Sequence, residues 1–109
     1  MDLKKIEGQS TFIKITLDEN GKEAGRAYLY LIKNNLHEEP YGLLEDVFVE
    51  EKYRGQGLGT KLMKEIIAEA KKHSCYKLIA TSRESRTEVH QWYEKLGFKK
   101  HGVEFRMDF

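Results

Sequence analysis

Hydrophobic and polar residues alternate in the first third of the chain, and this pattern predicts β structure. The alternation covers Thr11 to Leu17 and again about Glu23 to Ile32. Asn20-Gly21 lies between the two segments, and both residues tolerate the positive φ that a two-residue hairpin turn requires. The sequence therefore predicts an antiparallel hairpin, followed after a polar turn by a third strand at Tyr41 to Val49.

The period of the pattern changes after Leu58, where a helix is predicted. Its apolar residues recur on one face of a helix, at Leu62, Met63, Ile66, Ile67 and Ala70. A short apolar segment, Tyr76 to Thr81, predicts a fourth strand. A second helix is expected at about Thr87 to Leu96, with Gly97 at its C-terminal cap.

The last segments of the chain alternate again and predict a closing pair of strands, Phe98 to His101 and Val103 to Phe109. The strand-helix-strand order in the middle of the chain implies a parallel pair with a crossover, whereas the flanking hairpins are antiparallel. The predicted fold class is therefore α/β (α+β), with a mixed, mostly antiparallel central sheet and helices packed on it.

Composition narrows the class of protein. With 109 residues, 39% of them hydrophobic and 34% charged, we expect one compact domain over residues 1–109. No apolar run approaches the roughly 18 residues of a membrane span, and the N-terminus lacks the apolar segment of a signal peptide. The formal net charge of +1 gives no reason to expect binding to nucleic acid or to a membrane. The single cysteine, Cys75, favours a reducing, cytoplasmic location without a disulfide, and we expect no metal site.

The glycine-rich segment between the third strand and the first helix is the main candidate for chemistry. In Arg54 to Thr60, alternating glycines leave backbone N–H groups at the positive end of a helix dipole, with a guanidinium beside them. This arrangement suits a phosphate, although the glycines could also serve only a tight turn. The spacing fits neither the dinucleotide fingerprint nor the Walker loop, since Thr60 and Leu62 stand where those motifs need other residues.

Two blocks of sequence carry a family resemblance. The stretch from Leu44 to Leu62 resembles the acetyl-CoA motif of the GNAT superfamily of N-acetyltransferases, whose signature is Arg/Gln-x-x-Gly-x-Gly/Ala. The block from Trp92 to Phe98 resembles the C-terminal motif of the same family, in the family's order and spacing. The resemblance implies a GNAT-like fold in which the parallel strands splay apart, with a short N-terminal region. It also implies acetyl-CoA as co-substrate.

The resemblance further implies roles for particular residues. The backbone of one strand would pair with the pantetheine arm and hold the acetyl carbonyl; its residues are Val47, Phe48 and Val49. The pyrophosphate loop would comprise Arg54, Gly55, Gln56, Gly57, Leu58, Gly59 and Thr60. Tyr93 matches the tyrosine that protonates the departing CoA thiolate in many members, though it could instead be a core residue. Arg86 stands where many members carry asparagine, seven residues before that tyrosine.

Transfer of an acetyl group to an amine needs a neutral nucleophile, because an alkylammonium has a pKa of about 10.4. The candidate bases are Glu45 and Asp46, and successive strand residues face opposite sides, so we expect only one to face the cleft. Glu45 is expected to share a face with Val47 and Val49, and its position resembles that of an acidic residue on the acceptor side in relatives that acetylate small amines. The alternative for both is a solvated or structurally paired carboxylate. Three further residues are expected to be structural: Cys75, His90 and Trp92.

The predicted activity is an N-acetyltransferase that moves the acetyl group of acetyl-CoA to a primary amine by direct attack. The alternative is a non-catalytic acyl-CoA-binding or regulatory module. The hairpin already begins at Thr11, so the N-terminal helices that wall the acceptor site in the family are expected to be missing or supplied by a partner subunit, as in a homodimer. The acceptor amine, on a small molecule or a protein, stays open.

Overall fold

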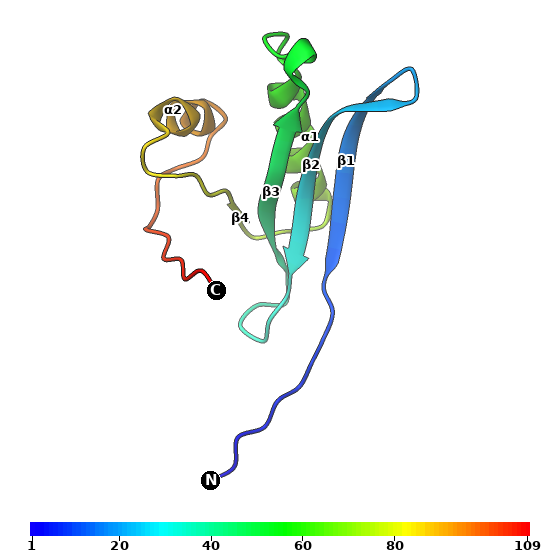
Figure 1. The fold of residues 1–109 in the computed structure, drawn as a ribbon. Helices are drawn as coiled ribbons and strands as arrows, with labels where there is room; N and C mark the ends of the chain where they lie inside the picture. Colours follow the sequence, from blue (N-terminus) through cyan, green and yellow to red (C-terminus); the bar gives the residue numbers. More distant parts are fainter.

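The computed structural model describes residues 1–109 and contains one four-stranded sheet with two α-helices (Figure 1). The strands lie in the order β1-β2-β3-β4. Their bounds are β1 Thr11–Glu19, β2 Lys22–Ile32, β3 Tyr41–Val49 and β4 Leu78–Ile79. A 3₁₀ turn, η1, at Glu51–Tyr53 precedes the helices α1, Leu58–Lys72, and α2, Thr87–Lys95. The predicted α/β (α+β) class is thus confirmed, with β1, β2 and β3 antiparallel and β4 parallel to β3.

The hairpin between β1 and β2 forms where the sequence predicts it. Asn20 and Gly21 adopt φ values of 52° and 79°, and Glu19 pairs with Lys22 across the turn. Positive φ at both turn residues matches the right-handed twist of the flanking strands, so this local sequence fixes the hairpin register.

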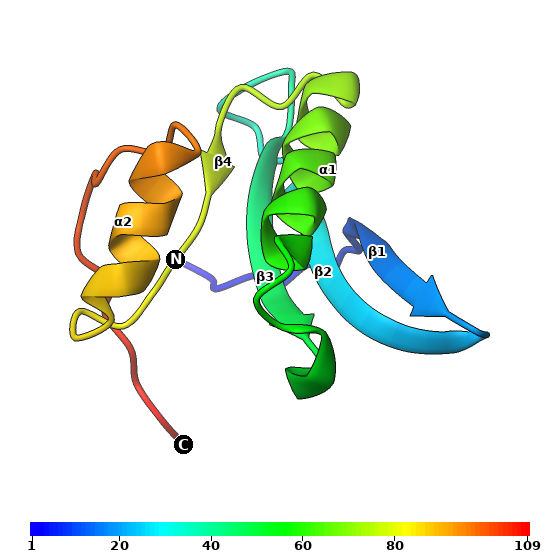
Figure 2. The same ribbon diagram turned by 90° about the horizontal axis from the view of Figure 1, so that it is seen from above.

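The core lies between α1 and one face of the sheet (Figure 2). From α1 it takes Leu62, Met63, Ile66 and Ala70, and from the sheet Ala27, Leu29 and Leu44. The three largest helix side chains are fully buried, which at about 1.5–3 kcal/mol each makes α1 the main stabilising partner of the sheet. The opposite face carries a half-exposed aromatic cluster of Phe12, Tyr28 and Tyr30, whose ring centroids lie 5.5 to 6.1 Å apart.

The parallel pair of strands is short. β3 and β4 pair only through Gly42 with Leu78 and Leu43 with Ile79, after which the chain of β4 moves away toward α2 (Figure 2). The expected splayed parallel pair is present, whereas the strand predicted at residues 76–81 is reduced to two residues. The edge of β3 beyond Leu43 therefore has no strand partner on its β4 side.

A bulge interrupts β3 at the start of this unpaired edge. Tyr28 pairs with Glu45 and Arg26 pairs with Phe48, so two residues of β3 lie opposite one residue of β2. Asp46, one of the two, has φ of 51°. Beyond the bulge Val47 and Val49 pack against the core under α1, as Leu44 does before it. The expectation that Glu45 shares a face with Val47 and Val49 is therefore wrong, because the bulge shifts the alternation by one residue.

The predicted closing strands are also wrong. Residues 96–109 contain no helix or strand, and residues 99–109 form no backbone hydrogen bond within the chain. The apolar face expected of the last strand is 77% to 114% exposed; it comprises Val103, Phe105, Met107 and Phe109. Alternation favours an extended backbone, but a strand also needs a partner, and β4 is too short to offer one.

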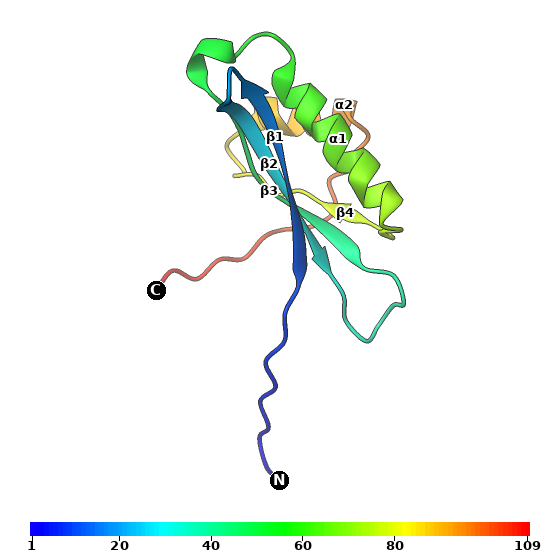
Figure 3. The same ribbon diagram turned by 90° about the vertical axis from the view of Figure 1, so that its right-hand side faces the viewer.

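Residues 1–10 likewise form no helix or strand. Both terminal segments extend away from the body of the molecule (Figure 3). Neither helix is long and apolar enough to cross a membrane.

Candidate active site

The glycine-rich loop turns directly into α1. Gly55 and Gly57 have φ of 82° and 76°, a left-handed conformation that side chains other than Gly and Asn adopt with strain, and Gly57 is the N-cap of the helix. The first hydrogen bond of the helix runs from the N–H of Lys61 to the carbonyl of Gly57, at 3.1 Å. The N–H groups of residues 55–60 bind no acceptor within the chain, so they form a set of free donors at the positive end of the α1 dipole.

Arg54 is held beside this loop. Its Nε donates a hydrogen bond of 2.8 Å to the carbonyl of Val49, and its guanidinium lies 5.4 Å from the ring centre of Phe48. The guanidinium of Arg26 lies 4.7 Å from the same ring. Arg54 therefore places a positive charge where β3 ends, with its two terminal nitrogens free for a ligand.

A hollow of about 240 Å³ opens where β3 and β4 part. One wall is the unpaired stretch of β3, Leu44 to Val47, and the other wall is made by Thr81 and Tyr93. A β3 residue on an unpaired edge offers backbone N–H and C=O groups that no strand uses. The hollow thus combines free backbone donors and acceptors with a phenol.

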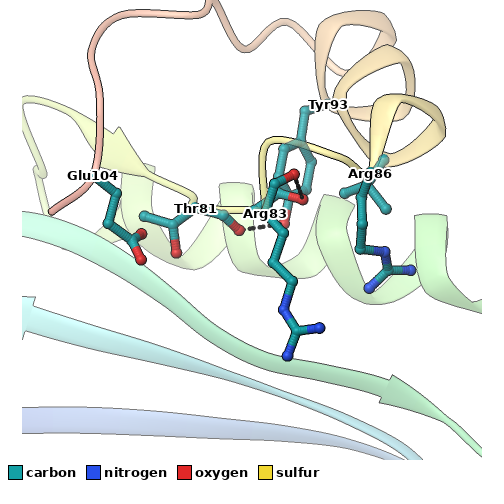
Figure 4. Close-up of a pocket in the computed structure, with 7 residues that line it drawn as sticks. Thr81, Arg83, Arg86, Tyr93 and Glu104 are labelled. Atoms are coloured by element: carbon teal, nitrogen blue, oxygen red, sulfur yellow. Dashed lines mark hydrogen bonds between the residues drawn. The ribbon is translucent and has the colours of Figure 1, made fainter. Parts of the chain in front are cut away.

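Tyr93 reaches into this hollow from α2. Its hydroxyl donates a long hydrogen bond of 3.4 Å to the carbonyl of Thr81 (Figure 4). Burial raises the pKa of Tyr93 above its ordinary value of 10.0; the cation of Arg86 opposes this shift and the carboxylate of Glu45 adds to it. Burial thus favours the neutral phenol of Tyr93 over its ionised form.

The two acidic residues of β3 differ sharply in their surroundings. Asp46 accepts a hydrogen bond of 2.7 Å from Nε of Arg26, and this bond lowers the pKa of the Asp46 carboxyl below its ordinary value of 3.8. Glu45 has no hydrogen-bond or ion-pair partner in the chain and lines the same hollow as Tyr93. Of the two carboxylates, Glu45 is the one free to meet a ligand.

Backbone hydrogen bonds close the C-terminal end of α2, just after Tyr93. Gly97, with φ of 106°, ends the helix, and the N–H of Phe98 donates to the carbonyl of Tyr93 at 3.0 Å. This closing pattern confirms Gly97 as the C-terminal glycine of the helix. Near the other helix, Nε1 of Trp92 donates to Oγ1 of Thr60 at 3.0 Å, which ties α2 to the glycine-rich loop.

The fold and this site match one family of proteins. Residues 2–98 match the model of the Acetyltransferase (GNAT) family, which is more than half of the chain. The chain belongs to the GNAT family. Members of this family use acetyl-CoA as co-substrate, and the resemblance seen in the two sequence blocks is confirmed.

Individual GNAT relatives cover the chain to different extents. The chain is 40% identical over 67 residues to glucosamine 6-phosphate N-acetyltransferase of Trypanosoma brucei brucei, covering 62% of this chain and 44% of that protein. It is 32% identical over 63 residues to glucosamine 6-phosphate N-acetyltransferase 1 of Dictyostelium discoideum, covering 58% of this chain and 38% of that protein. The match thus spans less than half the length of these curated relatives.

Solved GNAT structures agree with the fold over most of the chain. An acetyltransferase of Trypanosoma brucei superposes with a TM-score of 0.81 at 32% identity, covering 90% of this chain and 69% of its own. Glucosamine-6-phosphate N-acetyltransferase from Arabidopsis thaliana superposes with a TM-score of 0.80 at 27% identity, covering 90% of this chain and 67% of its own.

Within this GNAT fold, the structure brings together Glu45, Val47 and Tyr93 in one hollow and places the loop of residues 54–60 at the start of α1. Three residues expected to be structural behave so. Trp92 packs against the core, Cys75 lies beside Gly42 with its pKa raised by burial, and Nε2 of His90 donates to the carbonyl of Arg83 at 2.9 Å.

Sequence reasoning missed two participants in the site. The carbonyl of Thr81 accepts the Tyr93 hydroxyl, and the side chain of Arg83 lines a neighbouring hollow. Thr81 ends the predicted fourth strand, and ligands bind at the carboxyl ends of parallel strands, so this rule would have pointed to it.

Proposed function

We propose that this chain is an acetyl-CoA-dependent N-acetyltransferase that moves an acetyl group to a primary amine by direct attack. The observation that carries the proposal is the hollow between β3 and β4, which is lined by Glu45 of β3 and Tyr93 of α2. The edge of β3 at this hollow has no strand partner, and the strand leads to the glycine-rich loop. Acetyl-CoA supplies the activated acetyl thioester.

The residues present fit acetyl-CoA. The free N–H groups of residues 55–60 and the guanidinium of Arg54 suit the pyrophosphate, and an added side chain at Gly55 or Gly57 would occupy space that is open in the chain. The backbone of Val47, Phe48 and Val49 would hold the pantetheine arm, because no strand pairs with this edge; within it, the carbonyl of Val49 already accepts Nε of Arg54. A backbone N–H on this edge is a preorganised donor for the charge that develops on the acetyl oxygen.

Glu45 is proposed to receive the amine. A primary amine arrives as an ammonium ion with a pKa of about 10.4, so it must lose a proton before it can attack. An unpaired carboxylate in the hollow can hold the ammonium group and accept its proton, directly or through water. Asp46 is not proposed for this step, because its ion pair with Arg26 makes it a weaker base.

Tyr93 is proposed to protonate the leaving thiolate. Its phenol lies in the hollow opposite β3, and its raised pKa keeps the proton in place until negative charge builds on sulfur. A thiol has a pKa of about 8.5, so transfer from a phenol is uphill in water. The positive charge of Arg86, which favours the ionised form of Tyr93, reduces this cost.

The relatives suggest a first acceptor. Two of the most similar curated proteins are glucosamine 6-phosphate N-acetyltransferases. We propose glucosamine 6-phosphate as the acceptor to test first, ahead of polyamines, amino acids and protein amines. Residues 1–109 are proposed to form one acetyltransferase domain in the cytoplasm.

A homodimer is also proposed. The exposed apolar residues of the C-terminal segment, Val103, Phe105, Met107 and Phe109, support it, since water-exposed apolar side chains in alternation suit a strand added to a second copy.

The decisive experiment measures CoA thiol release from acetyl-CoA with a panel of amines, and acetyl-CoA binding by calorimetry on the same protein. Thiol release that depends on one amine, with the acetylated product identified by mass, establishes the proposed activity. Binding of acetyl-CoA without turnover of any amine would favour the non-catalytic module. Absence of binding would refute the assignment of the glycine-rich loop.

A further inference from the structure

An ion pair across the sheet occupies the second carboxylate of the transfer hollow. Glu45 and Asp46 are adjacent in β3 and both line the hollow, so two carboxylates compete for an ammonium group. Arg26 of β2 donates from Nε to one carboxylate oxygen of Asp46 at 2.7 Å and from Nη2 to the other at 3.3 Å. A two-point contact of this kind fixes the orientation of both groups as well as pairing their charges. The charge of Asp46 is therefore already paired within the chain, whereas that of Glu45 is not.

Arg26 is held in place by its neighbours on the sheet. Its Nη1 lies 3.4 Å from a carboxylate oxygen of Glu23, which pairs with Lys14 of β1 at 2.6 Å. Its guanidinium carbon lies 4.7 Å from the ring centre of Phe48, the residue that pairs with Arg26 in the β2-β3 register. A line of alternating charges thus crosses from β1 through β2 and ends at Asp46 on β3. A network of charges defines the position of Arg26 better than a single surface ion pair would.

Asp46 is also the residue that carries the bulge of β3. Its φ of 51° is a conformation that Asp tolerates because its short side chain can hydrogen-bond to nearby groups. The extra residue of a bulge is left out of the hydrogen-bond ladder to the neighbouring strand. The contact with Arg26 gives the bulge a side-chain link to β2 in place of the missing ladder contact. Because Glu45 directly precedes Asp46, this link also steadies the backbone that carries Glu45.

We propose that Arg26 is a positioning residue for the acetyl transfer: it pairs with Asp46, steadies the bulge, and leaves Glu45 as the one free carboxylate that receives the amine. Without Arg26, two free carboxylates would lie next to each other, and each would disfavour ionisation of the other. This inference rests on the proposed acetyltransferase function. The competing role for the ion pair is stability of the sheet alone, which would leave the ionisation of Glu45 unchanged.

Other charged and titratable groups lie around Glu45, and the test keeps them constant. They are Tyr28 of β2, Lys14 of β1, Tyr93 of α2, Arg86 at the start of α2, and Arg83 and Glu104, which line the adjoining hollow with Tyr93. The two tyrosines are neutral phenols at the pH where a carboxyl group titrates. Differences between variants that change only Arg26 and Asp46 therefore report on that pair.

The test measures the pH dependence of kcat/KM for thiol release, with acetyl-CoA and the same acceptor in every variant, beginning with glucosamine 6-phosphate. Arg26→Gln frees the Asp46 carboxylate, so the acidic limb of the profile should move to higher pH by about 0.5 unit or more. Asp46→Asn leaves the Arg26 cation unpaired, so the limb should move to lower pH. The double variant removes both charges and should return the limb to its wild-type position. A pair that only stabilises the sheet would move the limb in none of the three.

Lys22→Gln is the matched control, because Lys22 lies on the same strand, is exposed and forms no ion pair. It removes the same charge as Arg26→Gln and should leave the limb in place. An NMR titration of the Glu45 side-chain carboxyl carbon in the same variants makes the comparison without turnover, so it tests the inference even if no amine is acetylated. A melting curve on each variant confirms that it is folded.

Opposite displacements of the Glu45 titration in the two single variants, cancelled in the double variant, would establish the role of Arg26. An unchanged titration in both single variants would overturn it. An equal displacement in Arg26→Gln and in the double variant would also overturn it, because Asp46 would then not mediate the effect. A displacement of the same size in Lys22→Gln would assign the effect to net charge and overturn it as well.

Discussion

Replacement of Tyr93 by phenylalanine separates a catalytic hydroxyl from a packing ring. The ring centroid of Tyr93 lies 5.6 Å from that of Trp92 and 5.4 Å from that of Phe98, and phenylalanine keeps these contacts. The hydroxyl makes one hydrogen bond, to Thr81 at 3.4 Å, which is long for an O–H donor. Its loss should therefore cost only about 0.5 kcal/mol of stability, the low end for a hydrogen bond.

A loss of that size lowers the melting temperature of a small domain by about 2–4 °C. If the hydroxyl protonates the leaving thiolate, turnover should instead fall by about 10²- to 10⁴-fold, the range for general acid catalysis. Acetyl-CoA affinity should not change, because the interaction forms only as charge builds on sulfur. The kinetic effect is thus far larger than any effect of the lost stability.

The assay is thiol release at saturating acetyl-CoA, with a melting curve and a calorimetric titration on the same preparation. Tyr76→Phe is the matched control, because the ring of Tyr76 contacts that of His37, with centroids 4.0 Å apart, and lines neither hollow. A stable Tyr93→Phe variant with full turnover would refute the acid role and assign the proton to water.

Four further predictions test other parts of the site. Gly57→Val puts a β-branched residue at φ of 76°, which costs about 1–2 kcal/mol of backbone strain. In calorimetry it should reduce the affinity for acetyl-CoA at least about tenfold, whereas the control Gly8→Val should leave this affinity unchanged. Glu45→Gln should reduce turnover by about 10²-fold or more, with a smaller loss at high pH where the amine is already neutral; an unchanged pH–rate profile contradicts the base role. Arg26 lowers the pKa of Asp46 in the folded protein. The Asp46 carboxylate therefore stabilises the fold at pH values above its unfolded pKa of 3.8, and this stabilisation is lost as the pH falls through the lower folded pKa. The difference in melting temperature between wild type and Asp46→Asn should therefore shrink between about pH 5 and about pH 2, and a constant difference would exclude the ion pair as its cause. Deletion of residues 102–109 should convert a dimer into a monomer in sedimentation velocity, and a monomeric full chain would contradict the proposed homodimer.

Elements specified by local sequence could be predicted. The Asn20-Gly21 turn, the amphipathic α1 and the Gly97 cap each depend on residues within one or two turns of chain, and all three lie where expected. The position of the glycine-rich loop could also be predicted from the sequence, because its glycines lie between an apolar strand and an amphipathic helix.

Elements that depend on pairing between distant segments could not be predicted. Alternation in residues 103–109 indicates an extended backbone, but whether that backbone becomes a strand depends on a free partner edge, which sequence pattern does not reveal. The bulge is a similar case. Strict alternation was assumed through Glu45 and Asp46, yet Asp46 is a residue type that tolerates positive φ, and this was the available signal that the alternation could break there.

The bulge and the short β4 act on the same strand edge. A strand inside a sheet normally uses the backbone groups of both its edges, and β3 would do so if β4 continued beyond Ile79. Because β4 pairs through only two residues, the edge of β3 from Leu44 onward must find other partners. The bulge at Asp46 then turns Val47 toward the core and leaves Glu45 facing the hollow. The candidate site is therefore made of what the sheet leaves unpaired, and the proposed acetyl-CoA binding would supply the partners that a longer β4 would otherwise provide.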